Sequence, residues 1–428
     1  MIEKILDLHI HSKYSRACSG SLVLPNIAKE CELRGIDVVS TGDFTHPAWF
    51  EHIKDKLVED APGIFRLNDN SSKTRFILGT EVASIKKHAG KTRRVHLLIF
   101  APSIASVEKF NNALESRGCN LRADGRPILG LTCKEILSIM LEIDSGMVMI
   151  PAHAWTPWFG VFGSKGGYDR LEECFEDLSS HINAIETGLS SDPIMNRRCS
   201  CLDSIALISN SDAHSLQKLG REANIVSIKD EVGFTFAKIF SAIKSNNRKN
   251  FLSTIEFYPE EGKYHLDGHA VCNFVCTPEE TKKYGGLCPS CKKQLTIGVM
   301  NRISELSDRS EMEAKIFLHG SAVPFQSLVP LREIIADVLK KGVATKSVSE
   351  LYNRLLQTCG SEFFLLREAT LDNIAKFSTP RIAEAVHRVR VGRVHVRPGY
   401  DGVFGVVKIF VSEEKHGDVS QGRLLLDL

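Results

Sequence analysis

Short apolar runs alternate with amphipathic stretches along the first half of the chain. Seven runs that are rich in β-branched residues and end in polar ones predict strands over 4–9, 37–41, 75–81, 95–100, 147–153, 183–186 and 205–210. Apolar residues at helical spacing predict helices between them, over 24–33, 103–114, 132–143 and 169–181. This alternation of strand and helix is typical of an α/β fold with a largely parallel sheet.

The pattern changes in the second half. Alternation stops after about Asp230, and a loop-like segment over 256–265 follows. From about Val299 the chain is mostly helical, with helical spacing over 328–341 and 347–356. Residues 383–397 mix apolar and basic side chains before a turn-rich segment at 398–402. We therefore expect a domain boundary between 240 and 255.

Composition restricts the class of protein. The 428 residues are 43% hydrophobic and 25% charged, which suits two or three globular domains and excludes a disordered or fibrous chain. The formal net charge is only +2, so a nucleic-acid partner would have to bind local basic patches. No apolar run has the roughly 18 to 20 residues of a membrane span, and the N-terminus does not resemble a secretory signal. We expect a cytoplasmic protein without a membrane partner.

Side chains that bind metals follow the predicted strands. His9 and His11 alternate in an extended segment, so both point to the same side. Further candidates lie at or just past strand ends, which gather on one face of a closed parallel barrel, where active sites are built; they are Asp43, Glu81, His153, Glu186, Asp212 and His214. His96 is an exception, because it lies near the beginning of its predicted strand.

This residue set indicates hydrolytic metal chemistry. Imidazoles mixed with carboxylates favour an open site for zinc, manganese or magnesium over a closed structural site. The candidates exceed one coordination shell, which implies two or three ions that share a carboxylate. Such sites hydrolyse phosphoesters without a protein nucleophile, because neighbouring ions activate a water and stabilise the attacking and leaving oxygens.

The motifs resemble those of the polymerase and histidinol phosphatase (PHP) superfamily. They are Asp7-Leu8-His9-Ile10-His11-Ser12, Thr41-Gly42-Asp43, Gly79-Thr80-Glu81, Pro151-Ala152-His153 and Ser211-Asp212-Ala213-His214. The resemblance implies a distorted seven-stranded β/α barrel with catalytic residues Asp212, Glu81 and His153. It also implies one metal on His9, His11, Glu81 and Asp212, with Glu81 bridging to a second on His96 and His153. A third would take His214 with Asp43 or His46, although Ser15-Arg16-Ala17 stands where some relatives carry a histidine.

Four of the twelve cysteines lie close together. Cys272, Cys276, Cys288 and Cys291 have nearly the spacing of a structural zinc knuckle. Two alternatives fit: four thiolates, or three cysteines and one histidine, with Cys276 and His269 competing for the fourth place. A redox pair fits less well, because no strand-to-helix context of the thioredoxin kind surrounds it. The chain would thus comprise a catalytic barrel at 1–240, a zinc-binding domain at 255–310 and a mainly helical domain at 311–428.

The second half narrows the resemblance to the endonuclease Q family. The segments that carry it are 261–265, 267–269, the Cys288-Pro289-Ser290-Cys291 knuckle, 295–309 and Pro398-Gly399-Tyr400-Asp401-Gly402. The resemblance implies a DNA repair enzyme that nicks the phosphodiester 5′ of a deaminated base (uracil, hypoxanthine or xanthine) or an abasic site. The cut would leave a 3′-hydroxyl and a 5′-phosphate. In that family the knuckle uses the cysteines that match Cys272, Cys288 and Cys291.

Local features allow a damaged-DNA partner. Basic residues cluster at Lys86, Lys87, Lys91, Arg93 and Arg94 and again at Arg388, Arg390, Arg393 and Arg397. Trp155, Trp158 and Phe159 follow His153 directly and could stack on a flipped base. The alternative for the basic residues is an ordinary solvated surface, and the alternative for the aromatic residues is a lid in which they pack. A sliding clamp is a second conceivable partner, although no clamp-binding peptide is evident.

Two other functions compete with this interpretation. A small-molecule phosphoesterase of the same superfamily, such as a histidinol-phosphatase-like enzyme, would leave the zinc knuckle and the helical tail unexplained. A catalytically inactive DNA-binding accessory protein is opposed by the full set of candidate ligands.

Overall fold

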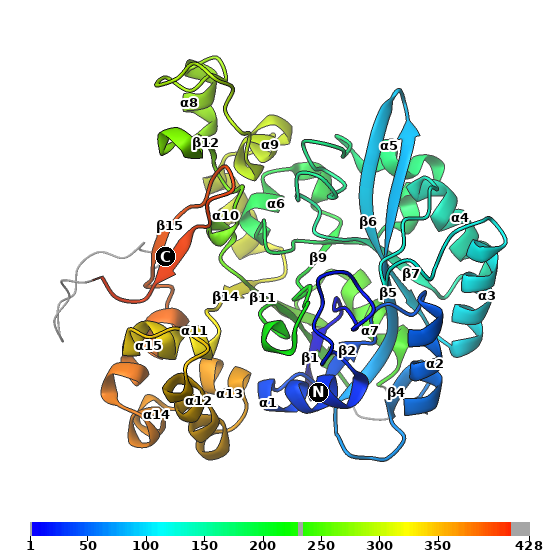
Figure 1. Ribbon diagram of the computed structural model, residues 1–428, viewed down its shortest axis with the longest axis horizontal. Helices are drawn as coiled ribbons and strands as arrows, with labels where there is room; N and C mark the ends of the chain where they lie inside the picture. Colours follow the sequence, from blue (N-terminus) through cyan, green and yellow to red (C-terminus); the bar gives the residue numbers. More distant parts are fainter. Residues whose placement is uncertain (1, 230–233, 412–428) are drawn as a thin grey trace.

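The computed structural model describes residues 2–229 and 234–411 of the chain (Figure 1). In Figure 1 the α/β part lies on one side, and the segment with α8 and β12 and the helices α11 to α15 lie on the other. Among the described residues no helix is long and apolar enough to cross a membrane.

The α/β part holds most of the strands. Its elements are β1 (Ile2–Asp7), α1 (Leu24–Arg34), β2 (Val38–Ser40), α2 (Pro47–Lys56), β3 (Leu57–Ala61), β4 (Ile64–Leu67), β5 (Arg75–His88), β6 (Lys91–Ala101), α3 (Ile104–Glu115), α4 (Cys133–Ile143), β7 (Val148–Pro151), α5 (Leu171–Phe175), β8 (Ala184–Glu186), α6 (Pro193–Arg197), β9 (Ala206–Ile208), β10 (Ala223–Ile228), α7 (Phe236–Lys244) and β11 (Phe251–Glu256).

The rest of the chain is mainly helical. Its elements are β12 (Asp267–His269), β13 (Phe274–Cys276), α8 (Pro278–Lys283), α9 (Val299–Leu306), α10 (Glu311–Gly320), β14 (Phe325–Ser327), α11 (Leu331–Leu339), α12 (Lys346–Cys359), α13 (Glu362–Arg367), α14 (Leu371–Phe377), α15 (Pro380–Arg390), β15 (His395–Arg397) and β16 (Val406–Lys408). The predicted helical region, 311–428, extends beyond the described residues.

The central sheet is mixed. β1 pairs with β2 and β2 pairs with β5 in parallel, as the alternating pattern predicts. Antiparallel partners flank them: β10 beside β1, and β6 beside β5. The β5–β6 hairpin turns through Ala89 and Gly90, both with positive φ, and such a short turn can join only antiparallel strands. The expected parallel arrangement therefore holds for β1, β2 and β5, whereas the strands on either side of them, β10 and β6, are antiparallel to their neighbours.

The strands share one apolar core. Leu6, Val38, Ile77, Leu98 and Ile150, from five different strands, are fully or almost fully buried in the same cluster, together with Ala184 of β8, Ile208 of β9 and Val226 of β10. Residues on the other face of these strands, such as Val39 and Leu97, belong to a second apolar cluster, which also contains side chains of helices α1 to α4. This alternation follows from the two-residue period of a strand.

The separate parallel pair β8–β9 lies between the end of β7 and the chain after β1. The Ala154 amide donates to the Glu186 carbonyl at 2.9 Å, and the His11 amide donates to the Ala213 carbonyl at 3.2 Å. These bonds connect the ends of β7, β8, β9 and β1 on one side of the sheet.

The sheet continues past the predicted end of alternation at Asp230. α7 packs there, and β11 pairs with β10 on one side and with β14 on the other. β11 carries polar residues in succession at Ser253 and Thr254 and a buried carboxylate at Glu256, which weakened its strand pattern. β3, β4, β10 and β14 were likewise not predicted. The helical region also contacts α1, where Arg34 lies 3.2 Å from the buried Glu362.

All seven predicted strands are confirmed, and most predicted helices have nearly their expected bounds. One helix differs. The segment 169–181 is α5 followed by a 3₁₀ helix (Glu176–His181), because Glu176 adopts a φ of +52° that ends the α-helix. The segment 383–397, which mixes apolar and basic residues, is helical in α15 to Arg390 and then forms β15, which pairs with β16.

Candidate metal centre

The ends of the strands bring most of the predicted ligands together. His9 and His11 follow β1, Asp43 follows β2, His153 follows β7 and Asp212 follows β9. Glu81 lies within β5. His96 belongs to the same group although it lies within β6, because β6 runs antiparallel to β5 and places His96 opposite Ala83. The antiparallel pairing thus explains why His96 did not fit a parallel pattern.

Three candidate residues of the site have a strained backbone. Asp43, His153 and Asp212 all have positive φ values, of 50°, 30° and 46°. Such conformations cost non-glycine residues about 1–3 kcal/mol each and persist where the surroundings enforce them. Gly188 is part of these surroundings, because a Cβ there would lie 2.6 Å from the Cβ of His153. The strain turns these side chains toward a common site.

Glu81 lies at the centre of the site and is fully buried. Its Oε1 lies 2.7 Å from His96 Nδ1 and 3.0 Å from His153 Nε2. Its Oε2 lies 3.3 Å from His11 Nε2 and 3.6 Å from His9 Nε2. The potential ligands form two groups that meet at this carboxylate: His9, His11 and Asp212, and Glu81, His96 and His153.

The donor atoms fit divalent cations. His9 Nε2 is buried and has no hydrogen-bond partner among the described residues, although Asp212 Oδ1 lies 3.5 Å away. The other nitrogen of His9 contacts both oxygens of Glu186 at 3.0 Å, and the Nδ1 of His11 contacts Asp43 at 3.0 Å. A carboxylate on Nδ1 fixes the tautomer whose Nε2 lone pair can bind a metal. The convergence of such atoms with carboxylates suits zinc, manganese or related ions.

The electrostatics of the site keep its carboxylates ionised. Burial raises the pKa of Glu81, but His96, His9 and Arg126 overcome it and hold the pKa well below its usual range. The pKa of Asp212 is lowered in the same way, mainly by His9 and His11. Burial lowers the pKa of His96 to about 4, with Glu81 opposing this shift. The ionised Glu81 carboxylate therefore lies beside a neutral His96 imidazole, and the ionised Asp212 carboxylate lies beside His9 and His11.

Asp43 and His214 lie beside the two groups and not within them. Asp43 contacts the Nδ1 side of His11, and its Oδ2 accepts bonds from the Ser12 amide, the Ser12 hydroxyl and the Ser15 hydroxyl at 2.7 to 2.9 Å. Ser15 thus occupies the region where some relatives would carry a histidine. The Nδ1 of His214 donates to the Asp212 carbonyl at 2.8 Å, and its ring lies 4.6 Å from that of His11.

Arg126 is a site residue that the sequence did not indicate, and Glu186 is a predicted candidate that bonds to His9 and His153. The Oε2 of Glu186 accepts from the His153 amide at 2.7 Å, and its Oε1 accepts from Asn210 at 2.8 Å. Glu186 was a candidate because it lies at a strand end, and the structure places it behind His9 rather than in either ligand group. Arg126 Nη1 lies 3.1 Å from Glu81 Oε2. It comes from a loop between α3 and α4 and carried no motif.

A separate group of ligands lies beyond the sheet. His269, Cys272, Cys288 and Cys291 have donor atoms within 4.8 Å of one another, with His269 Nδ1 3.6 Å from Cys291 Sγ. Cys276 lies elsewhere, 3.3 Å from the hydroxyl of Thr281. The structure thus favours His269 over Cys276 as the fourth member. Three thiols and one imidazole suit a closed tetrahedral zinc site.

The aromatic residues after His153 differ in exposure. Trp155 is only 1% exposed, and its indole N–H donates to Asn196 at 2.8 Å, so it packs in the interior and cannot stack on a base. Trp158 is 39% exposed and contacts the ring of Tyr264 edge-on. Phe159 stacks on His96 with ring centroids 4.3 Å apart.

The predicted basic residues are likewise divided. Arg390 donates to three carbonyls, of Leu365, Leu366 and Ala369, which makes it a structural link between α15 and α13. Arg93 donates to the Gly167 carbonyl and lies over the ring of Tyr168. Arg94 is half-buried, Arg393 is exposed, and the exposed lysines 86, 87 and 91 lie near the tip of the β5–β6 hairpin.

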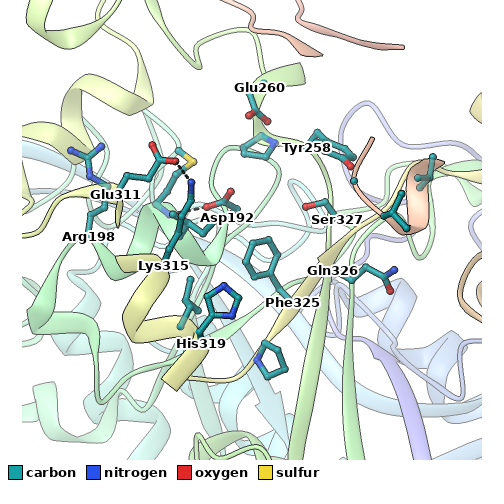
Figure 2. A pocket seen from close by; sticks show the side chains of 18 of the residues that line it. Asp192, Arg198, Tyr258, Glu260, Glu311, Lys315, His319, Phe325, Gln326 and Ser327 are labelled. Carbon is teal, nitrogen blue, oxygen red and sulfur yellow. Dashed lines mark hydrogen bonds and ion pairs between the residues drawn. The ribbon is translucent and has the colours of Figure 1, made fainter. Parts of the chain in front are cut away.

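A cavity of about 500 Å³ lies outside the metal centre. Figure 2 shows Asp192, Tyr258 and Phe325 around it, with Lys315 and Glu311 paired at 2.7 Å. Its walls come from α6, α10, β14 and the end of α15, and they include no member of the two ligand groups around Glu81.

Comparisons with known proteins cover nearly all of the chain. A family model described as MJ0043 C-terminal domain matches residues 330–393. The uncharacterized protein YqxK of Bacillus subtilis is 28% identical over 419 residues, which cover 94% of this chain and 98% of YqxK. The uncharacterized protein MJ0043 of Methanocaldococcus jannaschii is 31% identical over 280 residues, 64% of this chain, and the chain spans 34% of its length.

Two solved structures are similar over nearly their full lengths. The lesion-specific endonuclease PfuEndoQ from Pyrococcus furiosus has 33% identity and a TM-score of 0.82, with 95% of each chain covered. Endonuclease Q in complex with a 27-mer duplex substrate with an abasic lesion at the active site gives the same identity and TM-score, with 98% and 100% covered. The resemblance of the motifs to this family is confirmed: the chain belongs to the endonuclease Q family.

Proposed function

We propose that this chain is a metal-dependent DNA repair endonuclease. It would hydrolyse the phosphodiester 5′ of uracil, hypoxanthine, xanthine or an abasic site and leave a 3′-hydroxyl and a 5′-phosphate. The observation that carries the proposal is the buried Glu81 carboxylate, which joins two groups of metal-binding side chains in a chain of this family. The related endonuclease Q, whose duplex substrate has an abasic lesion, supports the choice of DNA.

The two ligand groups would hold two ions. His9, His11 and Asp212 would bind one, His96 and His153 the other, and Glu81 would bridge them. Bound ions would supply Lewis acidity and activation of the attacking water. Glu186 and Asp43 would act through hydrogen bonds to the imidazoles. Three hydrogen bonds from Ser12 and Ser15 already occupy Oδ2 of Asp43. A third ion would therefore bind His214 rather than Asp43.

The remaining parts would support this chemistry. The links from β7 to β8 and from the chain after β1 to the chain after β9 support a closed, distorted barrel at 1–240. A zinc-binding domain at 255–310 would use His269, Cys272, Cys288 and Cys291. The mainly helical region at 311–428 would form the third domain of the enzyme. The exposed Trp158 and Arg393 and the half-buried Arg94 are our candidates for DNA contacts.

Cleavage of end-labelled duplexes tests the proposal. Each duplex carries one uracil, hypoxanthine or abasic site, and reactions contain manganese, magnesium, zinc or a chelator. We expect a metal-dependent nick immediately 5′ of the lesion and no cut in the undamaged duplex. Asp212→Asn should abolish cleavage and retain DNA binding, whereas Asp177→Asn, at an exposed position, serves as the matched control.

Two outcomes would contradict the proposal. An unchanged rate in Asp212→Asn would exclude the metal assignment. The absence of any nick, together with release of phosphate from small phosphomonoesters, would instead support the phosphoesterase alternative.

A further inference from the structure

The Arg126 guanidinium reaches the metal centre from outside the strands. Its Nη1 lies 3.1 Å from Oε2 of Glu81, the oxygen that faces His9 and His11. The Glu81 side chain is fully buried, whereas that of Arg126 is 26% exposed. Arg126 thus connects the centre of the site with the solvent, from which a substrate would approach.

The loop that carries Arg126 is held firmly over the site. The Gly125 amide donates to the Tyr14 carbonyl at 3.1 Å, and the Ala83 amide donates to the Pro127 carbonyl at 2.9 Å. The loop also passes close to Asp43, because a Cβ on Gly125 would lie 2.3 Å from Asp43 Oδ2. Backbone hydrogen bonds on both sides of Arg126 therefore tie its loop to the chain after β1 and to β5.

The contact between Arg126 and Glu81 conflicts with the bridging role proposed for Glu81. When both oxygens of Glu81 bind cations, Oε2 has less capacity for the guanidinium, and the cations repel it. Arginine stays charged and binds phosphate oxygens through a planar fork of N–H groups. A phosphate group of the substrate that contacts the ions would lie close to the N–H groups of Arg126.

We propose that Arg126 is a catalytic residue that binds the scissile phosphate of the substrate. The guanidinium that contacts Glu81 in the structure would then contact a phosphate oxygen of the substrate and would stabilise the charge that develops there in the transition state. This inference rests on the proposed function and adds a residue to it.

The test compares Arg126→Gln and Arg126→Lys with Arg122→Gln, a control at an exposed position of the same loop. Single-turnover cleavage of an abasic duplex should slow by roughly 10²- to 10³-fold in Arg126→Gln, which is typical of losing one transition-state donor. Arg126→Lys should recover part of the rate, since it keeps the charge and loses the fork. The dissociation constant for the duplex should change much less than the rate.

Two measurements do not depend on cleavage. Metal content by mass spectrometry should equal that of the wild type in all variants. Calorimetric binding of orthophosphate to the manganese-loaded protein should weaken by about tenfold or more in Arg126→Gln and remain unchanged in Arg122→Gln.

The proposal is wrong if the cleavage rate and the orthophosphate affinity of Arg126→Gln both stay within twofold of the wild-type values. It would also be overturned by a loss of metal in Arg126→Gln with full recovery of rate on added manganese, because Arg126 would then only position Glu81. Failure of the wild type to cut the duplex would instead refute the proposed function, while orthophosphate binding would still report on Arg126.

Discussion

Replacing Glu186 by glutamine should weaken metal binding at the site. Glu186 touches no proposed ion, but both of its oxygens contact His9 Nδ1, and each accepts one further bond. Oε1 accepts from Asn210 and Oε2 from the His153 amide. Either orientation of a glutamine amide would therefore turn an NH₂ group toward a donor.

The expected magnitude follows from these bonds. Every orientation loses at least one hydrogen bond to a buried charged acceptor, a bond worth about 1.5–3 kcal/mol. Loss of a carboxylate behind a metal-binding histidine typically lowers metal affinity 10- to 100-fold, equivalent to about 1.4–2.8 kcal/mol. We expect the affinity for manganese to fall within this range and the imidazole of His9 to lose its fixed orientation.

Competition with a chromogenic chelator measures the affinity, with Glu173→Gln at an exposed position as the control. Circular dichroism establishes that the variant remains folded at the assay temperature. An affinity within twofold of the wild type, in a folded variant, would refute the reasoning that Glu186 orients His9 for a metal.

Three further predictions concern other parts of the molecule. Burial raises the pKa of Glu256 to about 8 from a usual 4.5, so the protonated carboxyl stabilises the fold fully below about pH 4.5, and this stabilisation is lost as pH rises through 8. The thermal unfolding midpoint of the wild type should therefore fall between about pH 5 and 9, and Glu256→Gln should flatten this fall. Identical pH profiles for the two proteins would contradict the prediction. Cys288→Ser should lose the structural zinc, measured by mass spectrometry, whereas Cys276→Ser should retain it; equal zinc content in both would place the site elsewhere. Trp158→Ala should weaken binding of a lesion duplex by about 1–3 kcal/mol in fluorescence anisotropy, whereas Trp155→Ala should instead lower the free energy of unfolding by about 3–5 kcal/mol; the reverse assignment of effects would refute the exposure argument.

Much of the central architecture was predictable from local patterns. The seven apolar runs are strands because they supply alternate residues to one core, and their ends carry His9, Glu81 and Asp212 to one site. β10 and β11 escaped prediction because their pairing depends on partners far away in the sequence. β14 is only three residues long and acquires its strand character from β11.

The site residues that sequence reasoning missed are those whose role is defined only by geometry. Arg126 belongs to no motif, and only the folding of its loop over Asp43 brings it to Glu81. Cys276 has a suitable spacing for zinc, but β13 directs it toward Thr281. Trp155 follows a site histidine directly, yet its side chain turns into the interior and bonds to Asn196. Spacing alone could not distinguish these orientations.

The pairing of β14 with β11 has a practical consequence for anyone who divides this chain. β14 comes from a segment some seventy residues beyond β11, yet it supplies the outermost hydrogen-bonded partner of that strand. A fragment that ends before Phe325 would leave the backbone groups of β11 as an open edge, which invites pairing between molecules. It would also strip Glu362 from the buried Arg34. An excised catalytic fragment should therefore be prone to self-association, and its inactivity would say nothing about which part carries the chemistry.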